Sequence, residues 1–338
     1  PSLLKFSIQN IYDSLNINKN KTLTFFDRQT IISLMTICTQ NETSAMGLHL
    51  LCTIYSITNK FDAILTEDAF ASFIQRILHT HICETISHAI NLLEVAVQHS
   101  FEIRRIFIEH RIFDMVYDIF VNDESLECAT FGFIDASLKQ PPILDPLADA
   151  TWPFLQFLIN HSSNEFFCDG MKLMKSLFLR NTSHKDEVEC LINDRHLTVG
   201  NMKPLLSLLS VCATLEIRTV FEDAQLYDRI LELVGGFDEE MFRELINLMK
   251  VQMIYLPLTT QALVPIIEQI IFVQIMPDCT MKQKEDLIYF INLGIKSCGI
   301  GQMISVIPTD FVCMILELSY SCDPPAKENI ADIISAWG

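Results

Sequence analysis

Apolar residues recur three and four positions apart along almost the whole chain, and short polar breaks separate the apolar segments. This spacing places apolar side chains on one face of an α-helix, whereas the alternation typical of a half-buried strand is absent. The pattern predicts the first helices over residues 2–15, 26–39, 44–57 and 67–79, with a polar turn at 16–22. The chain is therefore expected to be helical throughout.

Residues that suit helix ends mark the borders of these segments. Asp123 and Asp238 each precede an apolar helical pattern, where a carboxylate accepts hydrogen bonds from the unpaired N–H groups of the first turn. Gly235-Gly236 and Pro141-Pro142 follow such patterns, because glycine tolerates the C-cap conformation and proline cannot continue a helix. With only 10 glycines and 12 prolines in 338 residues, the chain has too few turn signals for a sheet protein.

The sequence also repeats itself. The apolar and charged positions of residues 103–120 recur in residues 217–234 at an offset of 217 minus 103, or 114, which is about three repeats of 38. A third copy begins near Phe61, where Ile64 corresponds to Ile106 at an offset of 106 minus 64, or 42. One unit is predicted to hold a short helix, a middle helix and a longer third helix, for example at residues 101–110, 112–120 and 124–138.

A three-helix unit of about 40 residues resembles the armadillo repeat. The resemblance implies an all-α protein: a right-handed superhelical solenoid of armadillo-like three-helix repeats, with no sheet. We expect residues 1–338 to form a single solenoid, with the clearest repeats at 61–138 and 185–255 and an irregular repeat at 140–160, which is rich in proline. Outside residues 61–298 the helix pairs would suit HEAT-like repeats equally well.

Composition narrows the classes of partner. Half of the residues are apolar and a fifth are charged, which is enough for a core and too apolar for a disordered chain. The net charge of -18 repels nucleic-acid phosphates and anionic membranes, so we expect no nucleic-acid partner, and a basic protein segment is the partner that this charge would attract. The most apolar stretch, residues 262–276, is interrupted by Pro265 and Glu268 and predicts no membrane span.

The 11 cysteines are scattered singly and contain no Cys-x-x-Cys pair. An odd number of unpaired cysteines in a large chain indicates a reducing compartment. We therefore expect a cytoplasmic protein, with the nucleus as the alternative.

Residues with catalytic or metal-binding chemistry form no recognisable constellation. His79, His81 and Cys83 are the one tight cluster of soft ligands, and a polar turn between helices accounts for them without a metal. Gly299-Ile300-Gly301 follows a helical rather than a strand pattern, which indicates a helix end and not a nucleotide loop. We predict no catalytic site, no cofactor and no metal; a hidden thiol enzyme is the competing hypothesis and would need a cysteine of low pKa.

The armadillo resemblance also implies where a partner would bind, because the third helices of such repeats line a concave groove that holds an extended peptide. Polar or aromatic residues interrupt the apolar pattern of the predicted third helices at Asn91, Phe131, Asp135 and Asn247. A polar residue in such a position must reach solvent or a partner. We therefore predict that Asn91, Phe131, Asp135 and Asn247 bind a partner.

These observations together predict a non-enzymatic protein-interaction or scaffold module, which presents an acidic solenoid surface to a peptide or to a subunit of a larger assembly. The alternative is a nuclear-transport-type adaptor that binds a basic peptide in the concave groove. In such adaptors a tryptophan and an asparagine one turn apart recur on the third helices. This sequence departs from that pattern, because Trp152 and Trp337 are its only tryptophans.

Overall fold

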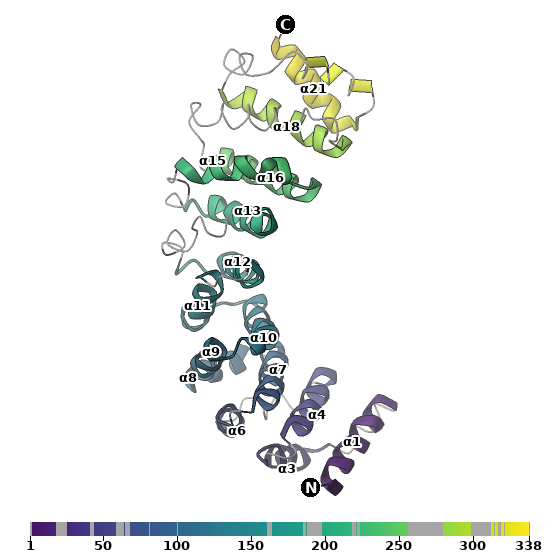
Figure 1. Ribbon diagram of the computed structural model, residues 1–338, viewed down its shortest axis with the longest axis vertical. Helices are drawn as coiled ribbons and strands as arrows, with labels where there is room; N and C mark the ends of the chain where they lie inside the picture. The colour runs from purple at the N-terminus through teal and green to yellow at the C-terminus, as the bar shows by residue number, and fades with distance from the viewer. Residues whose placement is uncertain are drawn as a thin grey trace. The chain divides into compact units, whose positions relative to one another are not determined.

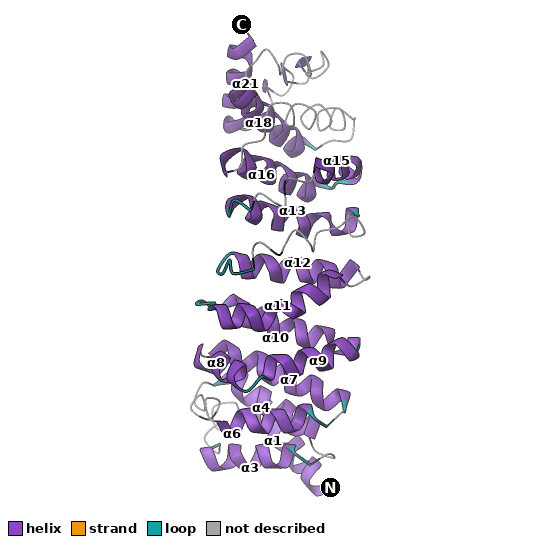
Figure 2. Ribbon diagram, turned by 90° about the vertical axis from the view of Figure 1, so that its left-hand side faces the viewer, coloured by secondary structure: helices purple, strands orange, loops and turns teal. Residues whose placement is uncertain are grey.

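In the computed structural model, the described residues form helices joined by turns and loops, and Figure 2 shows no strand among them. The residues that the structure describes are 2–17, 26–40, 44–58, 64, 68–80, 82–99, 101–160, 164–184, 187, 198–217, 221, 224–255, 280–298, 312–313, 315–316, 319–320 and 322–337. No helix among them is both long enough and apolar enough to cross a membrane.

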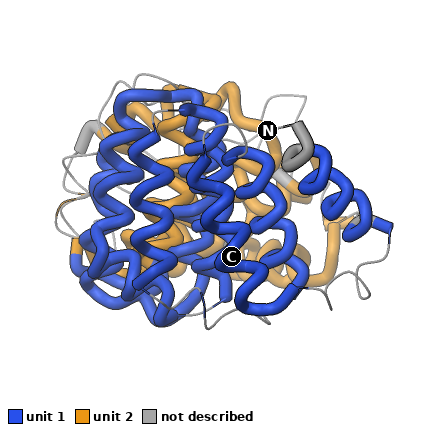
Figure 3. Tube along the Cα trace, turned by 90° about the horizontal axis from the view of Figure 1, so that it is seen from below, with its two compact units in different colours: residues 1–157, 179–183 blue, residues 158–178, 184–338 orange. Residues whose placement is uncertain are grey.

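The chain divides into two compact units (Figure 3). Unit 1 comprises residues 1–157 and 179–183, and unit 2 comprises residues 158–178 and 184–338. That residues 1–338 form one continuous solenoid stays a prediction.

The helices of unit 1 are α1 (Ser2–Ile17), α3 (Arg28–Cys38), α4 (Ser44–Ile57), α6 (Asp68–Leu78), α7 (Cys83–His99), α8 (Phe101–Glu109), α9 (Ile112–Asn122), the 3-10 turn η1 (Glu124–Leu126) and α10 (Glu127–Lys139). The border between the units falls within α11 (Asp145–Asn160). Unit 2 holds α12 (Asn164–Phe178), α13 (Val199–Thr214), α15 (Ala224–Leu233), the 3-10 turn η5 (Val234–Gly236), α16 (Glu239–Tyr255), α18 (Met281–Cys298) and α21 (Pro324–Trp337).

The predicted three-helix unit is confirmed in α8, α9 and α10, whose borders lie close to those expected from the sequence. Asp123 accepts a hydrogen bond from the backbone N–H of Ser125 at 3.1 Å and so caps the 3-10 turn η1, which leads directly into α10. Asp238 accepts from the backbone N–H of Met241 at 2.7 Å in the same role before α16. Both caps satisfy N–H groups that a helix start leaves unpaired.

The longer third helices lie side by side within each unit. In unit 1, α7 packs between α4 and α10, while α6 and α8 pack against its other side (Figure 1). In unit 2, α13, α16, α18 and α21 follow one another in the same way. Each third helix thus buries one stripe against its neighbours and leaves another stripe accessible.

Buried phenyl rings join the helices of unit 1 both within a repeat and between neighbouring repeats. The Phe70 and Phe107 rings lie 6.1 Å apart, Phe107 and Phe133 lie 6.5 Å apart, and Phe113 and Phe133 lie 4.8 Å apart, measured between centroids. All four side chains are almost fully buried. Burial of one such ring stabilises the fold by roughly 1.5–3 kcal/mol, so these contacts hold the stack together.

Hydrogen bonds that span about one repeat reinforce the stacking. The Gln140 amide donates to the Gln98 carbonyl at 2.7 Å, and the His99 ring donates to the Tyr55 carbonyl at 3.0 Å. In unit 2, the Lys175 ammonium donates to the Ser207 hydroxyl at 2.5 Å. These bonds connect each helix to the equivalent helix of the next repeat.

Residues 140–160 contain the proline-rich segment, and their assignment as an irregular repeat stays a prediction. The Pro141–Pro142 bond is cis, and Pro153 lies inside α11. Trp152, beside this proline, is 4% exposed and packs in the core. Trp152 is therefore not available as a peptide clamp, and the Trp337 side chain lies outside the described residues.

Candidate partner-binding faces on the third helices

The accessible stripe of the third helices in unit 1 forms a mixed polar and aromatic surface, which we call the unit 1 face. Its residues come from α1, α4, α7 and α10, and the contacts given below connect all of them except Phe131, which lies one turn before Asp135 on α10. They are Tyr12, His49, Cys52, His88, Asn91, Glu94, Phe131, Gly132 and Asp135.

Three rings form a row across this face. The Tyr12 and His49 rings lie 5.0 Å apart, and the His49 and His88 rings lie 5.4 Å apart. His49 and His88 are separated by 88 minus 49, or 39 residues, so they occupy equivalent positions in successive repeats. Burial and the neighbouring His49 lower the pKa of His88, and the Glu84 carboxylate opposes this shift.

Asn91 lies one turn after His88 on α7 and is half-buried. The Cys52 thiol on α4 donates to the Asn91 backbone carbonyl at 3.8 Å. Burial raises the pKa of Cys52 to about 11, with a further contribution from the negative charge of Glu94. The thiol therefore packs as a neutral group between the helices and is a poor nucleophile.

Two carboxylates face each other between α7 and α10. Glu94 is pressed against Gly132, where a Cβ atom would lie only 2.6 Å from the Glu94 Oε2 atom. Burial and, after it, the charge of Asp135 raise the pKa of Glu94, while Lys139 opposes the shift. Asp135 itself pairs with Lys139 at 2.5 Å. Glycine at position 132 thus makes room for a half-buried carboxylate beside a second one.

The third helices of unit 2 carry a different set of groups. Asn247 is exposed on α16, and Lys250, one turn later, places its ammonium 5.2 Å from the centre of the Tyr289 ring on α18. Burial raises the pKa of Asp286, also on α18, although Lys282 and Arg243 oppose the shift. Asn247 is thus placed next to a helix pair with both cationic and anionic side chains.

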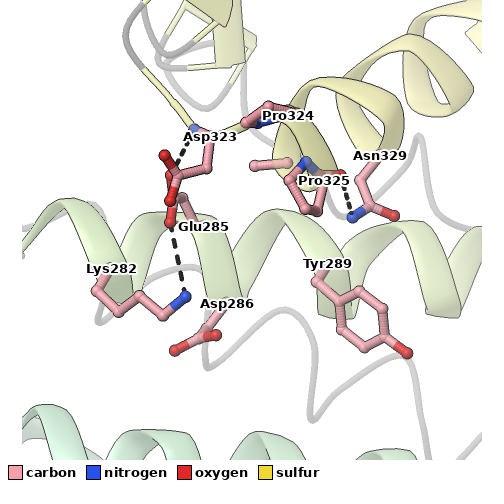
Figure 4. Close-up of a pocket in the computed structure, with 9 residues that line it drawn as sticks. Lys282, Glu285, Asp286, Tyr289, Asp323, Pro324, Pro325 and Asn329 are labelled. Carbon is pink, nitrogen blue, oxygen red and sulfur yellow. Dashed lines mark hydrogen bonds and ion pairs between the residues drawn. The ribbon is translucent and has the colours of Figure 1, made fainter.

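A pocket of about 420 Å³ lies between α18 and α21 in unit 2 (Figure 4). On its α18 side the Lys282 ammonium is 3.7 Å from Glu285, and Glu285 accepts the backbone N–H of Asp323 at 3.0 Å. Pro324 and Pro325 of α21 form its apolar wall. Glu285 is therefore occupied in holding the start of α21, which gives this carboxylate a structural role.

The structure places the four predicted partner-binding residues in two separate groups. Asn91, Phe131 and Asp135 lie on the neighbouring helices α7 and α10 of unit 1, and Phe131 is half-exposed. Asn247 lies in unit 2. Their contact with a partner stays a prediction.

Sequence reasoning missed the ring row and Glu94. A signal for the ring row was present, because His49 and His88 recur at the repeat spacing on third helices. Glu94 had no comparable signal, since its importance depends on Gly132 and Asp135 of the next helix.

Catalytic and metal chemistry gain no support from the part of the chain that the structure describes. No group of three or more histidine, cysteine or acidic residues there could hold a metal ion, and His81 of the cluster considered above lies outside the described residues. Burial raises the pKa of Cys38 and of Cys212 to about 12, the opposite of what a thiol nucleophile requires. None of the described cysteines forms a disulfide.

Comparison with solved structures identifies the fold. No family model and no curated protein sequence matches the chain. A structure reported for a phosphorylation switch that controls the interaction between cadherin and beta-catenin aligns over 99% of this chain and 66% of its own, with a TM-score of 0.58 and 12% identity. This chain thus spans slightly less than two thirds of that one.

An engineered protein aligns over 97% of this chain and 91% of its own, with a TM-score of 0.53 and 12% identity. A complex of SYS-1 and POP-1 aligns over 91% of this chain and 54% of its own, with a TM-score of 0.45 and 13% identity. The first two alignments cover nearly all of this chain, and they show that its fold is an all-α, armadillo-like helical repeat.

Proposed function

Since the chain has an armadillo-like fold, we propose that it is a non-enzymatic protein-interaction module whose unit 1 face binds an extended, basic segment of a partner protein. The partner segment belongs either to a peptide or to a subunit of a larger assembly. The similar structure reported for the interaction between cadherin and beta-catenin supports a role in protein binding. We further infer from the unpaired cysteines that the protein works in the cytoplasm or the nucleus.

The pairing of Glu94 with Asp135 is the observation that carries this proposal. Burial and the Asp135 charge both raise the pKa of Glu94, so the pair is unfavourable as it stands. A positive group from a partner would relieve this repulsion, and Lys139 supplies only one charge to the two carboxylates. Charges arranged in this way favour a lysine or arginine side chain over a neutral or acidic one.

Neighbouring side chains suit an extended segment. Asn91 lies one turn before Glu94, and Phe131 lies one turn before Asp135, so both flank the carboxylate pair. An asparagine amide both donates and accepts hydrogen bonds, as a peptide backbone requires, and a half-exposed phenyl ring packs on the aliphatic stem of a lysine or arginine. The predicted residues Asn91, Phe131 and Asp135 would thus act together.

Fluorescence polarisation on the full chain tests the proposal with three labelled octapeptides. One alternates lysine and arginine, one alternates glutamate and serine, and one alternates glycine and serine. We expect binding of the basic peptide alone, with an affinity that falls as salt rises, because exposed charges are screened.

The double variant Glu94→Gln/Asp135→Asn should weaken this binding about tenfold, which corresponds to about 1.4 kcal/mol. A matched control, Glu109→Gln/Asp118→Asn, removes the same charge from exposed positions on α8 and α9 and should change affinity less than about twofold. Equal effects of the two double variants would show that net charge alone attracts the peptide. That result, or equal binding of all three peptides, would refute the proposed face.

A further inference from the structure

The Tyr12, His49 and His88 rings, which we call the ring row, form a second cluster of side chains on the unit 1 face. The proposed binding of a basic segment to Glu94 and Asp135 does not involve them. The His49 and His88 rings lie 5.4 Å apart on neighbouring third helices, with Tyr12 on the far side of His49 at 5.0 Å. His49 is exposed and His88 is half-buried, so protons reach both rings from solvent.

The titratable and charged groups around the pair come from α1, α4, α7 and α10. Tyr12 faces the pair from α1, Cys52 lies one turn after His49 on α4, and Glu84 lies one turn before His88 on α7. The Glu84 carboxylate favours the protonated form of His88. The charged groups of α10, which packs on the other side of α7, are Glu127, Asp135 and Lys139.

Protonation of His49 and His88 would therefore add positive charge to the unit 1 face. With both rings neutral, the charged groups on and beside the unit 1 face are three carboxylates and one ammonium, namely Glu84, Glu94, Asp135 and Lys139. Two added protons would cancel the remaining negative charge. Histidine is the side chain whose charge changes most readily between pH 5 and 8.

We propose that the His49–His88 pair is a proton-controlled gate, which lets the unit 1 face hold a basic segment at neutral pH and releases the segment on acidification. This inference rests on the proposed function, since it concerns the regulation of the same face. Two positive charges within about 5 Å of each other repel one another and repel a cationic partner. Because burial and His49 lower the pKa of His88, this ring is protonated only at a lower pH than an ordinary histidine.

Binding of the lysine–arginine octapeptide to the full chain between pH 7.5 and pH 5.0 tests the gate. For the natural sequence we expect affinity to fall about tenfold, a change that corresponds to about 1.4 kcal/mol. The variant His49→Gln/His88→Gln keeps polar side chains that do not titrate and should lose no more than about threefold. Protonation of Glu94, whose pKa is raised, accounts for this remaining loss. The matched control His79→Gln/His110→Gln removes two histidines on the other side of α7 and should keep the full tenfold loss.

A second measurement separates failure of the gate from failure of the proposed function. In NMR titrations of the imidazole signals, His49→Gln should raise the pKa of His88, because it removes a neighbour that disfavours the charged form. No binding at any pH would refute the proposed function and leave this titration as the test of the pair. An unchanged His88 titration, or a tenfold pH effect that survives in the His49→Gln/His88→Gln variant, would overturn the gate.

Discussion

Arg104 offers the sharpest test of how the repeats are held together. This arginine is 1% exposed in α8, and its Nη1 atom donates to the Ser137 carbonyl at 3.1 Å and to the Gln140 carbonyl at 2.5 Å. Both carbonyls belong to the end of α10, where the helix dipole favours a positive charge. One guanidinium therefore ties the first helix of a repeat to the end of its third helix.

The expected cost of removing this side chain follows from these contacts. A hydrogen bond that involves a charged group stabilises a fold by about 1.5–3 kcal/mol, and two such bonds would be lost. Burial of the guanidinium, which lowers the pKa of Arg104, and the unpaired Nε atom offset part of that gain. We expect Arg104→Ala to destabilise unit 1 by about 3 kcal/mol, and Arg104→Met, which retains apolar packing, by about 2 kcal/mol.

Hydrogen exchange read by mass spectrometry is the suitable assay, because repeat stacks open locally and a single unfolding midpoint averages over them. Protection should fall in residues 101–109 and 127–140 in both variants. Arg105→Ala is the matched control: Arg105 is 56% exposed, pairs only with Glu102 and Glu109 at the surface, and should change local stability by less than about 1 kcal/mol. If Arg104→Met exchanged like the natural sequence, apolar packing and not the carbonyl contacts would be what matters at this position.

Three further outcomes follow from the packing. Gly170→Ala should lower the melting temperature, with a loss of about 1–3 kcal/mol in the free energy of unfolding, because the new Cβ atom would lie 2.8 Å from the Ile159 side chain of α11. Gly200→Ala is the control, since nothing lies within 4 Å of its new Cβ atom, and it should be neutral or slightly stabilising. Equal effects of the two variants would contradict the close approach at Gly170. In iodoacetamide labelling at pH 7.5, the exposed Cys83 should react long before Cys212, whose pKa burial raises to about 12, and prompt labelling of Cys212 would contradict its burial. Gly132→Ala should displace the Glu94 carboxylate and weaken binding of the basic peptide, while the circular dichroism spectrum stays unchanged. Full retention of affinity would argue against Glu94 as a contact of the peptide.

Much of the local structure could be predicted from the sequence, because apolar spacing and capping chemistry are short-range properties. The predicted helix at residues 44–57 is observed with the same borders, and Asp123 and Asp238 cap the helices expected of them. The match between residues 103–120 and 217–234 indicated the repeat before any packing was known. The helix borders and the caps depend on neighbours within about one turn, and the repeat follows from comparing two such local patterns.

The unit 1 face was less predictable, because it forms between helices about 40 residues apart. Asn91 and Asp135 were identified as polar interruptions, yet Glu94, between them in space, reads as an ordinary helix-surface acid. Its significance comes from Gly132, whose missing side chain leaves room for it. Such a contact can be predicted only when the residues of one third helix are aligned with those of the next. The 39-residue spacing from His49 to His88 provides this alignment.

The bonds from Gln140 to Gln98 and from Lys175 to Ser207 reach no farther than one neighbouring repeat. Within a unit, each repeat is thus stabilised by its nearest neighbours, so a destabilising change in one repeat affects the repeats that contact it and hardly any others. Such a design lets evolution add, delete or retune a single layer while the others keep their interfaces. It also means that a mechanical pull would peel the molecule layer by layer instead of breaking it in one step.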